Sequence, residues 1–269
     1  MNSNEQSVAR AFSRQSRVFD EYFSGNLIVQ YKRQRVRRLL SSYLSAGSRI
    51  LELNSGTGED AIWFAEQGHR VHATDISAGM LEVLNNKVSL KGLQDKITAE
   101  LCSFTNLQSL KTQGSYDLIF SNFAGLNCTA EINEVLGQFK NLLNPSGLVV
   151  LVVMPGFCLW ETGLLFRGKF KTAFRRFFSG KGVTARVEGN SFTCWYHRPS
   201  TVISAMKKDF ILLETEGLCS LVPPSYMEQF PEKHPALYQF LKEKEDRLKN
   251  KWPWKYTGDY YILAFRKKD

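Results

Sequence analysis

The chain has few of the residues on which several classes of protein depend. It is 269 residues long, and no apolar run approaches the roughly 20 residues that a membrane-spanning helix requires. Residues 1–17 are polar and lack the apolar centre of a secretion signal, so we expect a cytoplasmic protein. The five cysteines lie far apart without a Cys-x-x-Cys pair, which indicates neither a disulfide framework nor a metal site.

Acidic residues are fewer than basic ones, which leaves a net charge of +9. An excess of basic residues favours contact with nucleic acid, anionic lipid or an acidic substrate. A basic surface that is only solvated would have the same composition. Segment 167–181 interleaves basic and aromatic residues, so it is where we expect any contact with an anionic membrane. Nucleic acid is the less favoured partner, and the oligomeric state is left open.

From Ser48 onward the chain alternates apolar runs with segments of helical periodicity, which predicts an α/β fold with a parallel sheet and right-handed crossovers. Helices are also expected before this point, within residues 5–44. We expect the strands at 49–53, 70–74, 96–101, 116–121, 147–153, 210–220 and 260–265. We expect the later helices at 59–67, 78–90, 130–143, 199–208 and 234–250.

The most informative segment runs from Arg49 to Asp60. Its apolar run predicts a buried strand that ends on an acid and is followed by a small-residue turn and a helix. Glycine in such a turn lets the backbone approach a ligand, because it has no Cβ and accepts positive φ. The next expected strand ends on Asp75, and an acid there is the usual partner of ribose hydroxyls in open α/β sheets.

This combination resembles the class I S-adenosylmethionine (SAM)-dependent methyltransferases, and among them a bacterial small-molecule subgroup. Glu52 takes the family's acid position, and Gly56 and Gly58 take two of its glycine positions. Asn54 stands where a glycine is usual, and asparagine tolerates the left-handed region better than most residues. The resemblance implies a Rossmann-like, seven-stranded, mostly parallel sheet, with SAM as the cofactor and methyl transfer as the reaction.

The expected domain organisation follows from this resemblance. Residues 1–44 form an N-terminal helical lid, and residues 45–155 and 209–269 form the SAM-binding core. Residues 156–208 are an insertion after the fifth strand, which we interpret as a substrate cap. The insertion is expected to begin with a helical stretch over 158–178 and to continue as a hairpin of strands at 183–187 and 191–197.

The resemblance also implies a cofactor site. Asp75 would accept hydrogen bonds from the ribose, and Arg33 would pair with the methionine carboxylate, for which a guanidinium fork is suited. The acid that often follows the third strand is replaced by Ser103, so a hydroxyl or backbone groups must contact the adenine there. The expected cofactor residues are Phe19, Arg33, Glu52, Asn54, Ser55, Gly56, Gly58, Asp75, Ile76, Met80, Ser103, Phe104, Asn122 and Phe123.

For the acceptor, the apolar insertion favours a small, largely apolar metabolite or lipid precursor, with O-methylation preferred. The expected acceptor contacts are Tyr22, Asn127 and Trp160. The turn after the fourth strand lacks the Pro-Pro pair of nucleobase amino methyltransferases, which argues against that substrate class. A general base is needed only if the acceptor must lose a proton, and the candidates are His197 and, more weakly, Tyr196.

Two alternatives stay open at this point. A nicotinamide-dependent dehydrogenase would have a third glycine where Ala61 stands, although some dehydrogenases allow alanine there. A non-catalytic RNA- or membrane-binding module of the same fold would have lost SAM binding, and the intact set of Glu52, Gly56, Gly58 and Asp75 argues against it.

Overall fold

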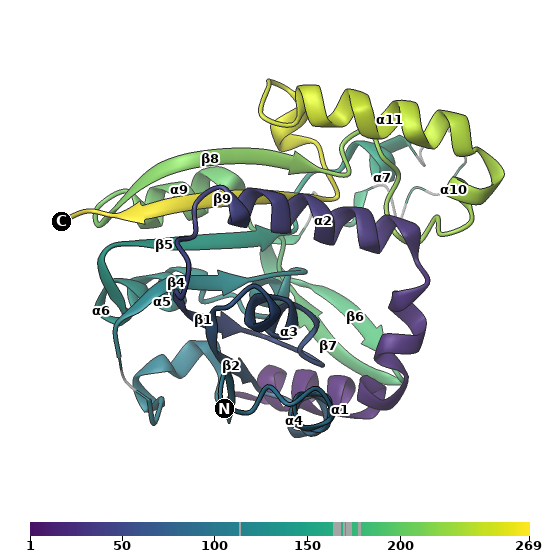
Figure 1. The fold of residues 1–269 in the computed structure, drawn as a ribbon. Helices are drawn as coiled ribbons and strands as arrows, with labels where there is room; N and C mark the ends of the chain where they lie inside the picture. Colours follow the sequence, from purple (N-terminus) through teal and green to yellow (C-terminus); the bar gives the residue numbers. More distant parts are fainter. Residues whose placement is uncertain (113, 164–167, 169, 171–173, 177–178) are drawn as a thin grey trace.

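The computed structural model describes residues 1–112, 114–163, 168, 170, 174–176 and 179–269. Its centre is a seven-stranded sheet in the order β3-β2-β1-β4-β5-β9-β8 (Figure 1). The first five strands pair in parallel, and β9 runs antiparallel to both β5 and β8. The mostly parallel, seven-stranded sheet is therefore confirmed. The strands are β1 (Arg49–Leu53), β2 (Arg70–Asp75), β3 (Ile97–Leu101), β4 (Tyr116–Ser121), β5 (Leu143–Val153), β8 (Phe210–Leu218) and β9 (Tyr260–Lys267).

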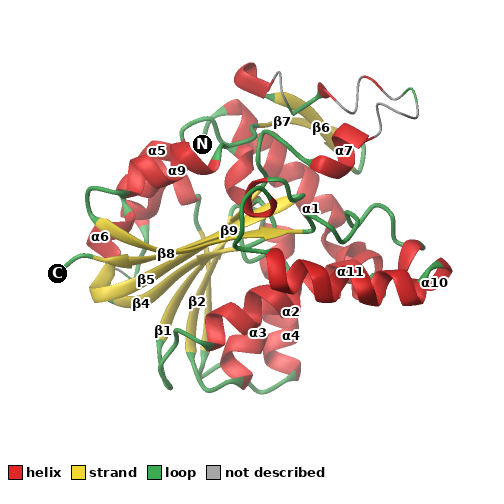
Figure 2. Ribbon diagram, turned by 90° about the horizontal axis from the view of Figure 1, so that it is seen from above, coloured by secondary structure: helices red, strands yellow, loops and turns green. Residues whose placement is uncertain are grey.

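Helices cover both faces of the sheet, as Figure 2 shows from above. One core lies between the sheet and α2 (Leu27–Ser41), α3 (Glu59–Glu66) and α4 (Ala78–Leu90). The opposite core lies under α5 (Ile132–Gly137), α6 (Phe139–Leu142), α9 (Pro199–Met206) and the 3-10 helix η1 (Phe104–Ser109). Both faces of the strands are thus buried, which accounts for their continuous apolar runs.

The N-terminal helix α1 (Ser3–Ser24) begins at a capping box, because Asn2 accepts from the backbone of Glu5 and the Glu5 side chain accepts from Asn2. α1 packs against α4 and against a hairpin of β6 (Val183–Val187) and β7 (Asn190–Cys194). A separate apolar cluster, built around Val8, Ala11, Phe192 and Cys194, joins α1 to this hairpin. Segments far apart in sequence therefore meet at one edge of the molecule.

The remaining elements surround the ends of the sheet. They are η2 (Gly125–Cys128), α7 (Leu159–Gly163), η4 (Ser179–Lys181), α10 (Phe230–Lys233), α11 (Pro235–Leu248) and η5 (Trp254–Tyr256). α11 lies along the outer side of α2 (Figure 1). In the described part of the chain, no helix combines the length and the apolar character that crossing a membrane requires.

Several expected boundaries are wrong. Strand β5 begins at Leu143, four residues before the expected start, because Leu143 pairs with Tyr116 ahead of an irregularity in the β4–β5 register. The helix expected at 130–143 is two short helices, α5 and α6. Strand β7 ends at Cys194, because Trp195 donates its backbone N–H to Asn127 instead of continuing the hairpin. Of the helical stretch expected over 158–178, the structure describes α7, while 164–167, 169, 171–173 and 177–178 lie outside the described residues.

Candidate functional site

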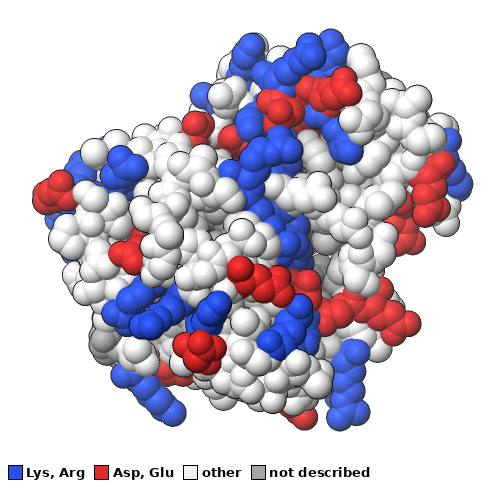
Figure 3. All heavy atoms as spheres, in the orientation of Figure 1, with Lys and Arg blue, Asp and Glu red and all other residues white. Residues whose placement is uncertain are grey.

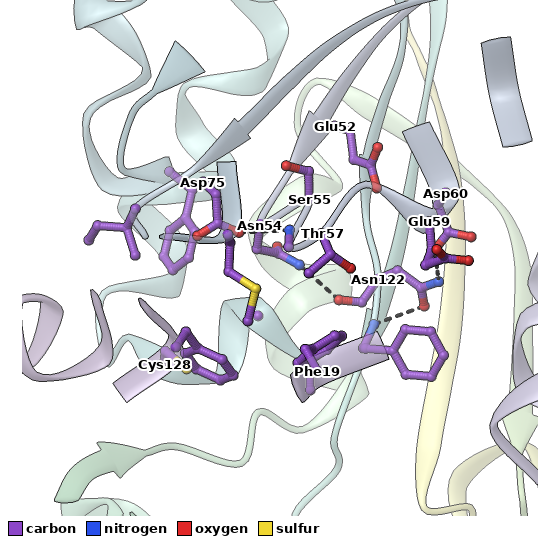
Figure 4. A pocket seen from close by; sticks show the side chains of 18 of the residues that line it. Phe19, Glu52, Asn54, Ser55, Thr57, Glu59, Asp60, Asp75, Asn122 and Cys128 are labelled. Atoms are coloured by element: carbon purple, nitrogen blue, oxygen red, sulfur yellow. Dashed lines mark hydrogen bonds between the residues drawn. The ribbon is translucent and has the colours of Figure 1, made fainter. Parts of the chain in front are cut away.

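A cavity lies at the carboxyl ends of β1, β2, β3 and β4, beneath α1 (Figure 4). In an open α/β sheet this edge is where ligands bind. α1 contributes Val8, Phe12 and Phe19 to the wall, at spacings of four and seven residues that place them on one side of the helix. Most of the expected cofactor residues meet here: Phe19, Arg33, Glu52, Asn54, Ser55, Gly56, Asp75, Ile76, Met80, Phe104, Asn122 and Phe123 line the cavity.

The turn after β1 is fastened to the turn after β4 by the side chain of Asn54. Its Nδ2 donates to the backbone oxygen of Asn122 over 2.9 Å (Figure 4). Its Oδ1 accepts from the Ser121 hydroxyl over 2.6 Å. The φ of Asn54 is 48°, the left-handed conformation expected for this position. A Cβ on Gly125 would overlap the Asn54 amide, so the asparagine fits because the residue facing it is glycine. Sequence reasoning missed Gly125.

Glu52 and Ser55 bring polar atoms without partners into the cavity wall. Among the described residues, Glu52 Oε2 and Ser55 Oγ are buried and have no hydrogen-bond partner. Burial raises the pKa of Glu52 well above its usual value, and the negative charge of Asp60 raises it further. Buried polar groups are normally paired, so two orphaned oxygens in one cavity fit a ligand that donates hydrogen bonds or carries positive charge.

Asp75 shapes the neighbouring turn. One carboxylate oxygen accepts from the backbone N–H of Gly56 and the other from that of Ser77, each over 2.8 Å. Burial raises the pKa of Asp75. The backbone N–H of Ile76 also bonds to this carboxylate. A carboxylate offers about four acceptor sites, so Asp75 can still accept a hydrogen bond at the cavity surface.

Asp60 is the centre of a buried charge network that sequence reasoning missed. It binds Arg33 over 3.0 Å, Arg37 over 3.0 Å and the amide of Asn122 over 2.8 Å. Burial alone would raise the pKa of Asp60, but the two arginines hold it below its usual value. Arg33 lies over the Phe123 ring, 4.9 Å from its centroid. Arg33 and Arg37 are one helical turn apart on α2, a spacing that could have indicated a shared partner.

Ser103, which the family pattern places near the adenine, does not line the cavity. Its hydroxyl donates to Glu5 of α1 over 2.5 Å, and Thr105 donates to the same oxygen over 2.6 Å. Burial alone would raise the pKa of Glu5, but these hydrogen bonds hold it below its usual value. The family's acid after β3 is thus absent from that position, while a carboxylate from α1 lies beside it. Cys102 and Phe104, which flank Ser103, do line the cavity.

Gly58 also lies outside the cavity, and its role is conformational. It is the N-cap of α3 with φ of 83°, and a Cβ there would meet the Leu84 side chain. A glycine is therefore required both for the backbone conformation and for the approach of α4.

The expected acceptor residues do not reach the cavity. Tyr22 is exposed on α1, and Trp160 of α7 packs edge-on against Phe230 of α10. Asn127 is fully buried and holds the ends of β5 and β7 together, because its amide binds the backbone of Met154 and Trp195. Its hydrogen-bonding groups are therefore used by the fold.

The two candidate bases also lie outside the cavity lining. His197 is buried, and its Nε2 is 3.0 Å from the carbonyl oxygen of Thr129, so this nitrogen carries a proton and donates it. Burial lowers the pKa of His197. Burial raises the pKa of Tyr196, whose ring lies under the guanidinium of Arg176. Neither residue lines the cavity in this structure, and a role for either as a base stays a prediction.

Comparison with known proteins identifies the domain around this cavity. Residues 50–147 match the family model described as a methyltransferase domain. They form a class I, SAM-dependent methyltransferase domain. The family uses SAM as its methyl donor, and this finding removes the nicotinamide dehydrogenase alternative.

Two curated relatives illustrate the range of acceptors. The tRNA 5-carboxymethoxyuridine methyltransferase of Escherichia coli K12 is 30% identical over 149 residues, 51% of this chain and 56% of that protein. The malonyl-(acyl-carrier protein) O-methyltransferase of Pectobacterium atrosepticum is 24% identical over 162 residues, 60% of this chain and 58% of that protein. The chain spans about half the length of the curated relatives it matches.

A solved structure extends the similarity in fold to the whole chain. The 1,6-didemethyltoxoflavin-N1-methyltransferase of Burkholderia thailandensis superposes with a TM-score of 0.58, covering 100% of this chain and 92% of that chain. The sequence identity is 13%, so this similarity shows the fold alone.

The residues of the cavity fit the family's cofactor. SAM carries an ammonium, a sulfonium and ribose hydroxyls, which are the groups that the unpartnered Glu52 oxygen and the Asp75 carboxylate can receive. Apolar side chains at the other end, including Val8, Phe12 and Ile76, suit a flat base.

Proposed function

We propose that the chain is a SAM-dependent methyltransferase that methylates an oxygen atom of a small, largely apolar metabolite or lipid precursor. The observation that supports this most is the orphaned Glu52 oxygen in a cavity at the carboxyl ends of the parallel strands. Such an arrangement is costly in an empty protein, because a buried carboxylate without a partner is destabilising. It is therefore expected where a cationic ligand supplies the partner.

In this proposal the chain's own residues bind and orient the donor. Asp75 receives the ribose hydroxyls, while Glu52 and Ser55 face the methionine portion. Arg33, fixed by Asp60, presents its remaining donors to the methionine carboxylate. When bound, SAM supplies a methyl group on a good leaving group, so alignment is the main catalytic task, worth about 7–11 kcal/mol of the barrier.

The cavity also limits which acceptors fit. Its described lining includes no histidine, lysine or tyrosine. The carboxylates of the lining are engaged in this proposal, Asp60 by two arginines, Glu59 by Lys87, and Glu52 and Asp75 by the donor. An acceptor oxygen that is already ionised needs no base, so we propose a carboxylate as the methylated group. The names of both relatives above describe acceptors that carry a carboxyl group, which agrees with this choice.

The N-terminal helices and the insertion are proposed to cover the reaction. Residues 1–44 act as the lid, since α1 and α2 supply Val8, Phe12, Phe19 and Arg33 to the cavity wall. Residues 156–208 act as the cap over the core of 45–155 and 209–269, since the β6–β7 hairpin packs on α1. Together they would exclude water from the transfer. Contact of segment 167–181 with an anionic membrane stays a proposal, and several of its residues lie outside the described ones.

Donor binding is tested by calorimetric titration with SAM, S-adenosylhomocysteine and NAD. We expect SAM and S-adenosylhomocysteine to bind and NAD not to bind. Asp75→Asn is expected to weaken both interactions strongly, because a carboxylate that accepts from two hydroxyls becomes an amide. Asp95→Asn, at an exposed position, is the matched control. NAD binding without SAM binding would overturn the proposal.

The acceptor is tested by incubating the protein with cell extract and SAM labelled in the methyl group. A methyl ester releases labelled methanol in mild alkali, whereas a methyl ether or methylamine retains its label. We expect a small, alkali-labile product that partitions into organic solvent. Label that is alkali-stable would refute the carboxylate, and label lost on ribonuclease treatment would refute the small acceptor.

A further inference from the structure

The outward face of α11 is unusual for a helix that packs on a folded core. Leu237 and Phe240 are 47% and 52% exposed, and Lys244 and Arg247 continue the same side of the helix. The spacing of three, four and three residues keeps these four side chains on one strip. The Lys244 ammonium lies over the Phe240 ring, 5.3 Å from its centroid.

The turn that follows α11 carries two more exposed side chains of the same kinds. Lys251 is exposed, and Trp252 beside it is 78% exposed, although tryptophan is normally well covered. Within the described residues, Lys244, Arg247 and Lys251 pair with no carboxylate. Of the two acids nearest this strip, Glu243 accepts from Gln239 and Asp246 binds Arg38 and Lys249. Figure 3 shows basic side chains, with acidic ones among them, at the top of the molecule, where Figure 1 places α11.

The opposite face of α11 is firmly attached to α2. The Tyr238 hydroxyl donates to the backbone of Leu27, and the buried Glu245 accepts from the Tyr31 hydroxyl over 3.0 Å. Glu245 also accepts from three backbone N–H groups at Cys219, Leu221 and Val222. These contacts fix α11 on α2, the helix that carries Arg33 of the cavity wall.

We propose that the outer face of α11 and the turn after it, namely Leu237, Phe240, Lys244, Arg247, Lys251 and Trp252, bind the surface of an anionic membrane. Apolar side chains flanked by unpaired basic ones are the composition of helices that lie in a lipid interface. Tryptophan suits that boundary, because one part of its ring is apolar and its N–H stays hydrated. An RNA partner is less suited, since single strands bind in basic grooves by stacking on aromatic rings, whereas this strip is one face of a helix and includes the aliphatic Leu237. The proposal does not depend on methyl transfer.

The test is sedimentation of the whole protein with vesicles, without donor or acceptor. We expect binding to vesicles that contain phosphatidylglycerol, weak binding to phosphatidylcholine alone, and release at high salt. Lys244→Glu/Arg247→Glu should reduce the bound fraction at least about tenfold, since each basic residue near an anionic surface contributes to attraction. Phe240→Ser/Trp252→Ser should also reduce the bound fraction but should leave its dependence on salt unchanged.

Two control variants match these changes elsewhere on the surface. Arg10→Glu/Arg14→Glu, on the exposed side of α1, changes the net charge by the same amount. Leu90→Ser removes an 87% exposed apolar side chain that lies beside Lys91. Both controls should bind vesicles as the unmodified protein does, and circular dichroism checks that every variant is folded. Equal loss in the controls, no preference for anionic vesicles, or tighter binding of RNA through the same residues would each overturn the proposal.

Discussion

The donor side of the cavity and the expected acceptor side differ in what their polar side chains are doing. On the donor side, Glu52 and Ser55 keep unpartnered oxygens at the cavity wall. On the acceptor side, Asn127 and His197 are buried and form their hydrogen bonds with backbone groups of the chain itself. Residue type alone would rank the four as equally able to bind a ligand. The state of their hydrogen bonds separates those available to a ligand from those that hold the structure.

The two sides also differ in how their backbone is assembled. The donor turns follow β1 and β2 within consecutive strand–turn–helix units, although Asn54 also contacts Asn122, 68 residues away. On the acceptor side the residues themselves come from distant segments, because Trp195 and His197 belong to the insertion and contact Asn127 and Thr129 of the loop after β4, each 68 residues away. Substitutions on the two sides should therefore have different effects on stability and on donor binding.

Breaking the charge network under the donor side should have the largest effect. Asp60→Asn leaves Arg33 and Arg37 without a carboxylate, and removing one partner of a buried pair costs about 3–5 kcal/mol. We expect the unfolding free energy, measured by urea denaturation, to fall by about 3 kcal/mol. This is the lower end of the range, because the arginine side chains are 17% and 24% exposed. SAM binding should also be lost.

Glu66→Gln is the matched control for Asp60→Asn, since Glu66 lies on the same helix but pairs with Lys91 at the surface. This control should lower the unfolding free energy by less than about 1 kcal/mol, because the ion pair that it removes is exposed. Equal effects of the two substitutions would show that Asp60 does not organise the site.

The Asn54–Gly125 contact predicts a compensating pair of substitutions. Gly125→Ala places a methyl group against the Asn54 amide, and overpacking of this kind costs about 1–3 kcal/mol. SAM affinity should fall with stability, because the two turns that line the donor side are pushed apart. Adding Asn54→Gly removes the clash and should recover part of both losses. A double variant no better than Gly125→Ala would show that the two residues are not coupled.

The pH dependence of donor binding should identify Glu52. In the free protein burial and Asp60 raise its pKa, whereas a bound cation favours the carboxylate. Binding therefore releases a proton at pH values below that raised pKa, so affinity for SAM should fall as the pH falls through it, by at most about tenfold per pH unit. Glu52→Gln should bind more weakly and lose this part of the pH dependence. Titrations in buffers of different ionisation enthalpy count the protons released, and an unchanged pH profile in Glu52→Gln would contradict this assignment.

Most of the fold could be predicted from the sequence, because strands such as Arg49–Leu53 and Arg70–Asp75 are short apolar runs bounded by turn residues. The donor turns were predictable for the same reason, since each belongs to one continuous motif. Asp60 and Gly125 were missed because their importance comes from neighbours outside the motif, namely the arginines of α2 and the side chain of Asn54. Single residues carry no local pattern that reveals such partners.

His197 shows the limit of residue type as a guide. A lone histidine in the insertion was a reasonable base candidate, and the Thr129 carbonyl that engages it comes from the loop after β4. A contact of this range follows from how the insertion returns to the core, which periodicity does not encode. The same holds for Tyr196, whose ring is covered by Arg176.

The smallest effect on chemistry is therefore expected at His197. His197→Ala removes a buried hydrogen bond and part of the packing between the insertion and the loop after β4, so the unfolding free energy should fall by about 1–3 kcal/mol. Donor affinity and the rate of methyl transfer should stay unchanged at a temperature where the variant is folded, because the ring does not line the cavity. Thermal unfolding and single-turnover methyl transfer measure the two quantities separately. A large loss of transfer rate at unchanged SAM affinity would return His197 to the reaction and would mean that the acceptor side rearranges when both substrates are bound.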